Sequence, residues 1–217
     1  MCTFNMEEKE VIKKIIKGIA HIGSSKPEFN YDRLIIEAQD SLKGIFDECL
    51  RKEIDEFDYS VFTYSLERLV EKAFEENIKG GIQANIAILY HIAKSFESRE
   101  LRINPTISVI QTLRNIGIRC AEKRWEDLLF ICFNTLLVLG RDLSQELKYH
   151  LMSFCSAIVV ASFCNKYIPE VLPRIEDILK REIKDLEEVK KYSLDDTRVY
   201  SQIQYSVLRE YLSKSRI

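Results

Sequence analysis

The chain has 217 residues, of which 46% are hydrophobic and 30% are charged, a balance typical of a globular protein rather than a disordered one. The formal net charge of −2 gives no bulk attraction to nucleic acid, which excludes binding driven by overall charge. With seven glycines and four prolines, few residues remain for the tight turns of a sheet protein, so the composition favours long helices joined by short connections.

Apolar residues at helical spacing predict four helices in the first half of the chain. Their expected ranges are about 6–22, 30–54, 59–74 and 82–96. Asp58 is the expected cap of the third helix, because a carboxylate can accept a hydrogen bond from a free backbone N–H at a helix start. We interpret Asn77-Ile78-Lys79-Gly80-Gly81 as the turn before the fourth helix, since its adjacent glycines accept backbone angles that other residues resist.

Five more helices are predicted in the second half, at about 105–121, 125–140, 144–164, 172–191 and 195–214. Residues 125–140 are apolar on nearly every side, and only Asn134 and Thr135 interrupt them. Such a helix must be covered on several sides, so we expect other helices packed around it. Gly117 and Ala121 are small and four residues apart, which would let a neighbouring helix come close to the preceding one.

These segments together predict an all-α fold of about nine helices. No segment of five or more residues shows sustained alternation of apolar and polar residues, the pattern typical of a half-buried strand. We expect one all-helical domain over residues 1–217, with a sub-boundary near 99–104 where the sequence is charged. Two arrangements stay open at this point, stacked antiparallel helix pairs in an α–α superhelix and a compact helical bundle.

A short phrase of apolar residues followed by glycine recurs, as Leu-Arg-Asn-Ile-Gly at 113–117 and Leu-Leu-Val-Leu-Gly at 136–140. Each phrase precedes a polar turn and another helix, and the stretch over 105–165 resembles HEAT or armadillo-type α-helical repeats. This resemblance implies a binding scaffold and brings no catalytic residue with it. The alternative interpretation is that apolar residues before glycine simply mark helix ends.

The six cysteines include no Cys-x-x-Cys pair, and Cys132, Cys155 and Cys164 lie within apolar helical segments. There a cysteine behaves as a small hydrophobic residue, so the pattern indicates a reducing, cytoplasmic location rather than a disulfide-linked scaffold. The longest apolar stretches, 128–140 and 151–164, are shorter than the ~18–20 residues of a membrane span. We therefore expect no membrane span.

Candidate catalytic and metal-binding residues are few. None of His21, His91 and His150 pairs with a cysteine or another histidine at ligand spacing, and Glu146–His150 has no second copy. Cys120 lies between two cations but lacks an identifiable base, so we interpret it as a core residue. The sequence also lacks phosphate-binding loops and nucleophile motifs. We predict no catalytic, cofactor-binding or metal site, and a protein that is not an enzyme.

Two features bear on partners. A small basic segment contains Arg114, Arg119, Lys123, Arg124 and Trp125, but interspersed acidic residues dilute it, which argues against nucleic-acid binding. The last predicted helix carries Tyr200, Tyr205 and Tyr211, with Tyr192 just before it. Tyrosine is favoured at protein interfaces because it combines apolar area with a polar tip.

These observations lead to two functional hypotheses. The first is a non-enzymatic α-helical scaffold or interaction module that binds another protein or a second copy of itself. The second is a helical bundle that encloses an apolar small molecule between the helices of residues 105–165, where Phe, Leu, Ile and Cys are abundant.

Overall fold

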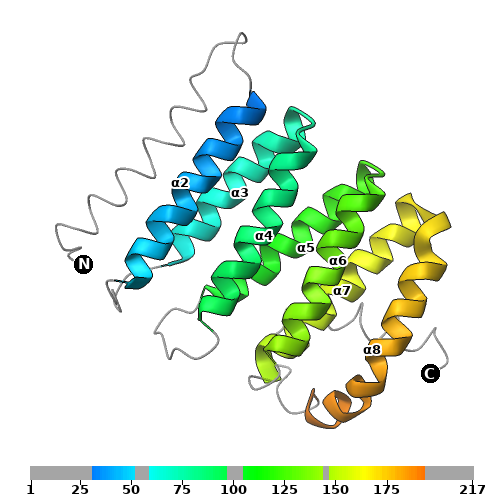
Figure 1. Cartoon of the computed structure of the whole chain (residues 1–217). Coiled ribbons are helices and arrows are strands. Elements are labelled where there is room, and N and C mark those ends of the chain that lie inside the picture. The colour runs from blue at the N-terminus through cyan, green and yellow to red at the C-terminus, as the bar shows by residue number, and fades with distance from the viewer. Residues whose placement is uncertain (1–30, 52–58, 97–104, 144–146, 194–217) are drawn as a thin grey trace, which may run out of the picture. The chain divides into compact units, whose positions relative to one another are not determined.

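A computed structural model describes residues 31–51, 59–96, 105–143 and 147–193, and every regular element in these ranges is a helix (Figure 1). The all-α prediction is therefore confirmed for the described residues. The chain divides into two compact units, Met1–Ser108 and Val109–Ile217. Within unit 1 the described helices are α2 (Tyr31–Arg51), α3 (Ser60–Glu75) and α4 (Lys79–Ser95).

Unit 2 holds most of α5 (Thr106–Glu122), then α6 (Glu126–Asp142), α7 (Leu147–Tyr167), the short 3-10 helix η1 (Pro169–Val171) and α8 (Leu172–Ser193). The described residues thus form seven α-helices, not the nine that we expected. The predicted first and last helices, at 6–22 and 195–214, lie outside the described residues. So does Asp58, the expected cap of the third helix.

Unit 1 is centred on Phe46 of α2. Its ring makes edge-on contacts with Tyr59, Phe62 and Phe96, at centroid distances of 6.0, 5.4 and 5.8 Å. All four rings are at most 1% exposed. Edge-on aromatic pairs add about 0.5–1.5 kcal/mol each beyond their buried area, so this cluster fixes how the ends of α2, α3 and α4 meet.

The turn predicted over residues 77–81 is confirmed at Asn77, but its two glycines are not part of it. Both glycines lie in the first turn of α4, and the connection from α3 is made at Asn77, whose φ of 58° is in the left-handed region. Asparagine tolerates that region better than most residues, so it replaces glycine there. Gly81 serves packing instead, because a Cβ on it would lie 3.0 Å from the Ile35 Cγ2 atom of α2.

Unit 2 is built around two helices that are buried on several sides. The predicted helix at 125–140 is α6, one or two residues displaced, but one edge of it reaches the surface at Asn134. The more completely covered helix is α7, in which every residue from Tyr149 to Ile158 is buried. α7 packs against both α6 and α8, so it has a neighbour on opposite sides.

Two glycines make this packing close. A Cβ on Gly117 of α5 would lie 2.7 Å from Val160 Cγ2 of α7, and one on Gly140 of α6 would lie 2.9 Å from Phe154 Cε2 of α7. Ordinary contacts begin at 3.4 Å, so neither position admits even a methyl group without displacement. The expectation that Gly117 lets a neighbouring helix come close is confirmed.

Candidate functional site

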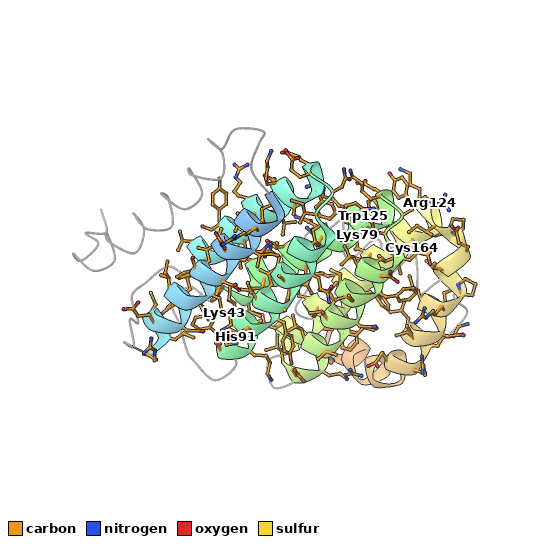
Figure 2. All side chains as sticks on the ribbon, turned by 45° about the horizontal axis from the view of Figure 1, so that its top comes forward. Lys43, Lys79, His91, Arg124, Trp125 and Cys164 are labelled. Carbon is orange, nitrogen blue, oxygen red and sulfur yellow. The ribbon has the colours of Figure 1, made fainter. Side chains whose placement is uncertain are left out.

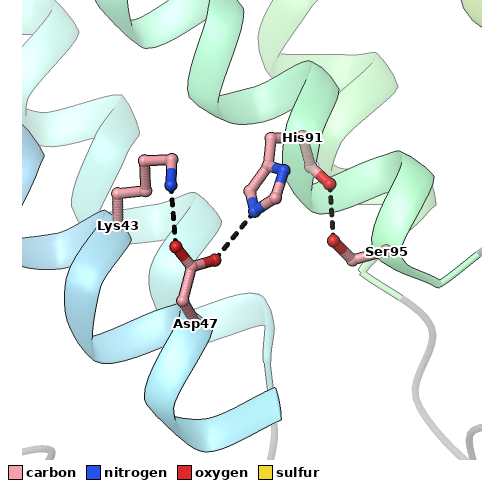
Figure 3. Close-up of polar contacts among 4 residues, drawn as sticks. All are labelled: Lys43, Asp47, His91 and Ser95. Carbon is pink, nitrogen blue, oxygen red and sulfur yellow. Dashed lines mark hydrogen bonds and ion pairs between the residues drawn. The ribbon is translucent and has the colours of Figure 1, made fainter. Parts of the chain in front are cut away.

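Unit 1 contains a polar network that joins two helices (Figure 3). Asp47 of α2 accepts a hydrogen bond from Lys43 Nζ at 2.7 Å and lies 2.8 Å from the Nε2 atom of His91 on α4. Burial raises the pKa of Asp47, but the hydrogen bonds and positive charge of Lys43 and His91 outweigh it, so the net pKa is lowered. Asp47 is therefore held as a carboxylate.

This network has the charge of an acid–base site but not its geometry. The hydroxyl of Ser95 donates to the backbone carbonyl of His91 at 2.8 Å, rather than to the imidazole. A nucleophile would need to reach a ring nitrogen of the base directly. The side chains of Asp47 and His91 are also 36% and 41% exposed, so water screens their interaction. We interpret the network as a brace between α2 and α4.

A second polar group of unit 1 is fully buried between the same two helices. Gln39 Nε2 and Asn85 Nδ2 both donate to the backbone carbonyl of Gly81, at 2.8 and 3.3 Å. The amide oxygens of Gln39 and Asn85 have no hydrogen-bond partner in the described structure. Because these amides are fully buried between α2 and α4, the pair restricts how the two helices can be aligned.

The cysteines that the sequence assigns to the core are buried thiols. Burial raises the pKa of Cys155 and of Cys164 to about 12, and it raises that of Cys132 well above the ordinary value. A thiol with such a pKa is protonated near neutral pH and is a poor nucleophile. Cys132 also donates a hydrogen bond to the Leu113 carbonyl at 2.8 Å, which links α6 to α5.

His150 is buried as well. Its Nδ1 atom is hydrogen-bonded to the Gly140 carbonyl, and its ring meets that of Phe154 edge-on at 4.8 Å. Both contacts join the start of α7 to the end of α6. Within the described residues, no three histidine, cysteine, aspartate or glutamate side chains gather as a metal site would require.

The basic segment of the sequence is dispersed by the structure. Arg124 and Trp125, labelled in Figure 2, lie at the turn between α5 and α6. Arg124 pairs with Glu170, and Nζ of Lys123 lies 5.7 Å from the centre of the Trp125 ring. Arg114 lies two to three turns earlier on α5 and is half-buried. Its one recorded polar contact is a 3.4 Å approach to the amide oxygen of Asn115.

The surface with the most suitable composition for a protein partner lies on unit 2. We define the α5–α7 face by six residues, three on each helix. On α5 they are Arg114, Ile118 and Glu122, and on α7 they are Phe163, Lys166 and Tyr167. The rings of Phe163 and Tyr167 stack at 6.2 Å with an angle of 21°, and Lys166 Nζ lies 4.8 Å from the centre of the Tyr167 ring.

Helix geometry makes the two halves of this face continuous. Gly117 of α5 lies against Val160 of α7. Further along both helices, the hydrogen bond and charge of Tyr167 raise the pKa of Lys166, and the negative charge of Glu122 adds a smaller effect. Glu122 and Lys166 are both exposed, so each lies on the outer side of its helix. Sequence analysis missed the face because its two halves lie about 45 residues apart.

Comparison with known proteins identifies no relative: no family model, curated protein or solved structure matches the chain. None of the described helices has both the length and the apolar character required to cross a membrane.

Proposed function

We propose that this protein is a non-enzymatic α-helical module that binds another protein through the α5–α7 face. The observation that carries the proposal is the residue composition of that face. Phe163 and Tyr167 are half-buried and stacked on each other, and Arg114 and Ile118 contribute to the same face from α5. Tyrosine, phenylalanine and arginine are enriched at protein interfaces, and tyrosine and arginine recur among the residues that dominate binding energy.

The contacts within the face favour binding because they lower its entropic cost. Stacking on Phe163 and the adjacent Lys166 ammonium restrict the Tyr167 ring before any partner arrives. Immobilising a flexible side chain on association costs about 0.5–1.5 kcal/mol, and a ring already held in place avoids part of this cost. Tyr64 of α3 is more exposed, at 55%, but none of the described residues stacks a second aromatic ring on it, so it offers less apolar area than the Phe163–Tyr167 pair.

The chemistry of the described polar groups supports binding rather than catalysis. The Asp47–His91 pair braces two helices, His150 joins α6 to α7, and the thiols of Cys132 and Cys155 have raised pKa values. Each group thus has a structural role in its own unit. The hypothesis of an apolar ligand between the helices of 105–165 stays a prediction, and the close contacts at Gly117 and Gly140 do not favour it.

The test uses the full chain and a matched pair of tyrosines. Tyr167→Ser alters the α5–α7 face, whereas Tyr64→Ser removes an equally cation-paired tyrosine from α3. Light scattering would measure self-association, and affinity capture with a zero-length cross-linker from the source organism would recover other partners. We expect a complex that Tyr167→Ser weakens and Tyr64→Ser leaves intact.

A strictly monomeric protein that captures no partner would refute the proposed function. Loss of the complex in both variants alike would also count against the α5–α7 face. Far-ultraviolet circular dichroism would confirm that both variants keep their helical structure, so that lost binding is not lost folding.

A further inference from the structure

Resting on the proposed protein-binding function, we propose that the α5–α7 face recognises an acidic segment of its partner. A partner carboxylate pairs with Arg114, and an apolar side chain a few residues away packs against Phe163 and Tyr167. The inference thus names the chemistry of the partner and assigns Arg114 as the residue that selects it.

Arg114 differs from the other described arginines in combining partial burial with the lack of a carboxylate partner. Arg33, Arg68, Arg124 and Arg141 each contact a glutamate side chain. Arg114 is half-buried, yet none of the carboxylates in the described ranges pairs with it.

Partial burial removes water from a guanidinium, and a neutral amide at 3.4 Å compensates for this poorly. An ionised carboxylate supplied by a partner is the group that complements it best, because its two oxygens match the paired N–H groups of arginine.

The other residues of the α5–α7 face do not compensate the positive charge of Arg114. Glu122 and Lys166 attract each other across the junction of α5 and α7, so their charges largely cancel. Ile118, Phe163 and Tyr167 contribute apolar area. The face therefore has one net positive charge at one end and an aromatic pair at the other, which is complementary to a segment with an acidic end and an apolar end.

The helices also set the spacing between the two ends. Gly117 lies opposite Val160. The hydrogen bonds between neighbouring helices show that α5 and α6 are antiparallel and that α6 and α7 are antiparallel, so α5 and α7 run in the same direction. Arg114 is then level with residue 157 of α7. Phe163 and Tyr167 lie six and ten residues beyond that level, about 9 and 15 Å along the axis at 1.5 Å per residue. An extended peptide covers this span with about three to five residues.

The experiment uses fluorescein-labelled peptides and the full chain. The probe has two glutamates, three serines, then leucine and phenylalanine; a second peptide has glutamines in place of the glutamates. Fluorescence anisotropy would measure both affinities at low and high salt. We expect the glutamate peptide to bind about fivefold more tightly at low salt, a typical value for one partly exposed charge pair. High salt should reduce that preference.

Variants of the protein identify the residue responsible. Arg114→Gln should abolish the preference for glutamate over glutamine, and Arg114→Lys should keep part of it, because lysine retains the charge without the fork geometry. Arg33→Gln is the control, since Arg33 is an exposed arginine of the other unit that already pairs with Glu37. Urea unfolding should show little loss of stability in Arg114→Gln, which breaks no ion pair.

Equal affinity for the two peptides, or the same glutamate preference in wild type and Arg114→Gln, would overturn the inference. Absence of binding by either peptide up to millimolar concentration would overturn it as well. These failures are distinct from failure of the proposed function: a partner complex that depends on Tyr167 but ignores peptide acidity would leave the binding function standing and remove only the acidic partner.

Discussion

Replacing Gly117 with alanine would place a methyl group in contact with α7. Its Cβ would lie 2.7 Å from Val160 Cγ2, 3.1 Å from Val160 Cγ1 and 3.5 Å from Cys132 Sγ. The nearest atoms belong to a β-branched side chain on a helix, which has one strongly preferred rotamer and cannot turn away easily. Either α5 or α7 must move, and such overpacking typically costs about 1–3 kcal/mol.

A favourable effect opposes this cost. Alanine stabilises a helix interior by about 1 kcal/mol relative to glycine, so the net loss expected for Gly117→Ala is about 1 kcal/mol. Gly44→Ala provides the control, because Gly44 lies within α2 and a Cβ there would meet no atom within 4 Å. The same substitution should stabilise the protein at that position by about 0.5–1 kcal/mol. The change from glycine to alanine is thus predicted to lower the free energy of unfolding at Gly117 and to raise it at Gly44.

Urea unfolding followed by far-ultraviolet circular dichroism would measure both variants, because this signal reports on helices of both units. Adding Val160→Ala to Gly117→Ala should recover stability relative to the sum of the two single changes, since it removes the methyl groups that collide with the new Cβ. If Gly117→Ala were as stable as the wild type while Gly44→Ala behaved as expected, the close contact between α5 and α7 would be refuted.

Three further outcomes follow from the described contacts. Asp47→Asn should lower the free energy of unfolding by about 0.5 kcal/mol at pH 7, a small value because the site is partly exposed. Since Lys43 and His91 lower the pKa of Asp47, the difference from wild type in urea unfolding should vanish as the pH falls through that pKa. An unchanged difference at pH 2 would contradict this assignment. Cys155 should resist a thiol reagent at pH 8 until the protein is denatured, as mass spectrometry of labelled peptides would show, and rapid labelling of the native protein would refute its burial. Gln39→Glu should lower the free energy of unfolding, measured by chemical denaturation, by more than about 2 kcal/mol because it buries a charge. Gln39→Met should lower it less, since this change also removes an unpaired amide oxygen. Equal losses in the two variants would contradict the burial of this side chain.

The helices themselves could be predicted from the sequence because their signal is local. The apolar repeat placed α6 and α8 within one or two residues of their observed bounds. The end of the turn after α3 could not be placed in this way: residues 77–81 were predicted as the turn, but α4 already begins at Lys79, so Gly80 and Gly81 are helical. Gly81 is instead closely packed, since a Cβ on it would lie 3.0 Å from Cγ2 of Ile35, 46 positions earlier in the chain.

Hydrogen bonds and ion pairs between helices were less predictable, because they too join residues that are far apart in the sequence. Asp47 and His91 lie 44 residues apart, and no pattern within either helix indicates that they meet. Arg114 was recognised as one of several basic residues, but its distinctive property is the lack of a nearby carboxylate. Such an absence depends on where the acidic residues of other helices lie, so only the packed structure can reveal it.

Close packing also accounts for the recurring apolar phrase that ends in glycine. Gly117 and Gly140 end two copies of it; Gly117 lies inside α5, whereas Gly140 lies in the last turn of α6. Both glycines contact bulky side chains of α7: Gly117 meets Val160, and Gly140 meets Phe154. A buried helix that packs tightly against two neighbours requires a small residue on each of them, with apolar residues one turn earlier on the same side. The similarity of the two phrases therefore has a sufficient physical cause within unit 2, whether or not the chain contains a true repeat.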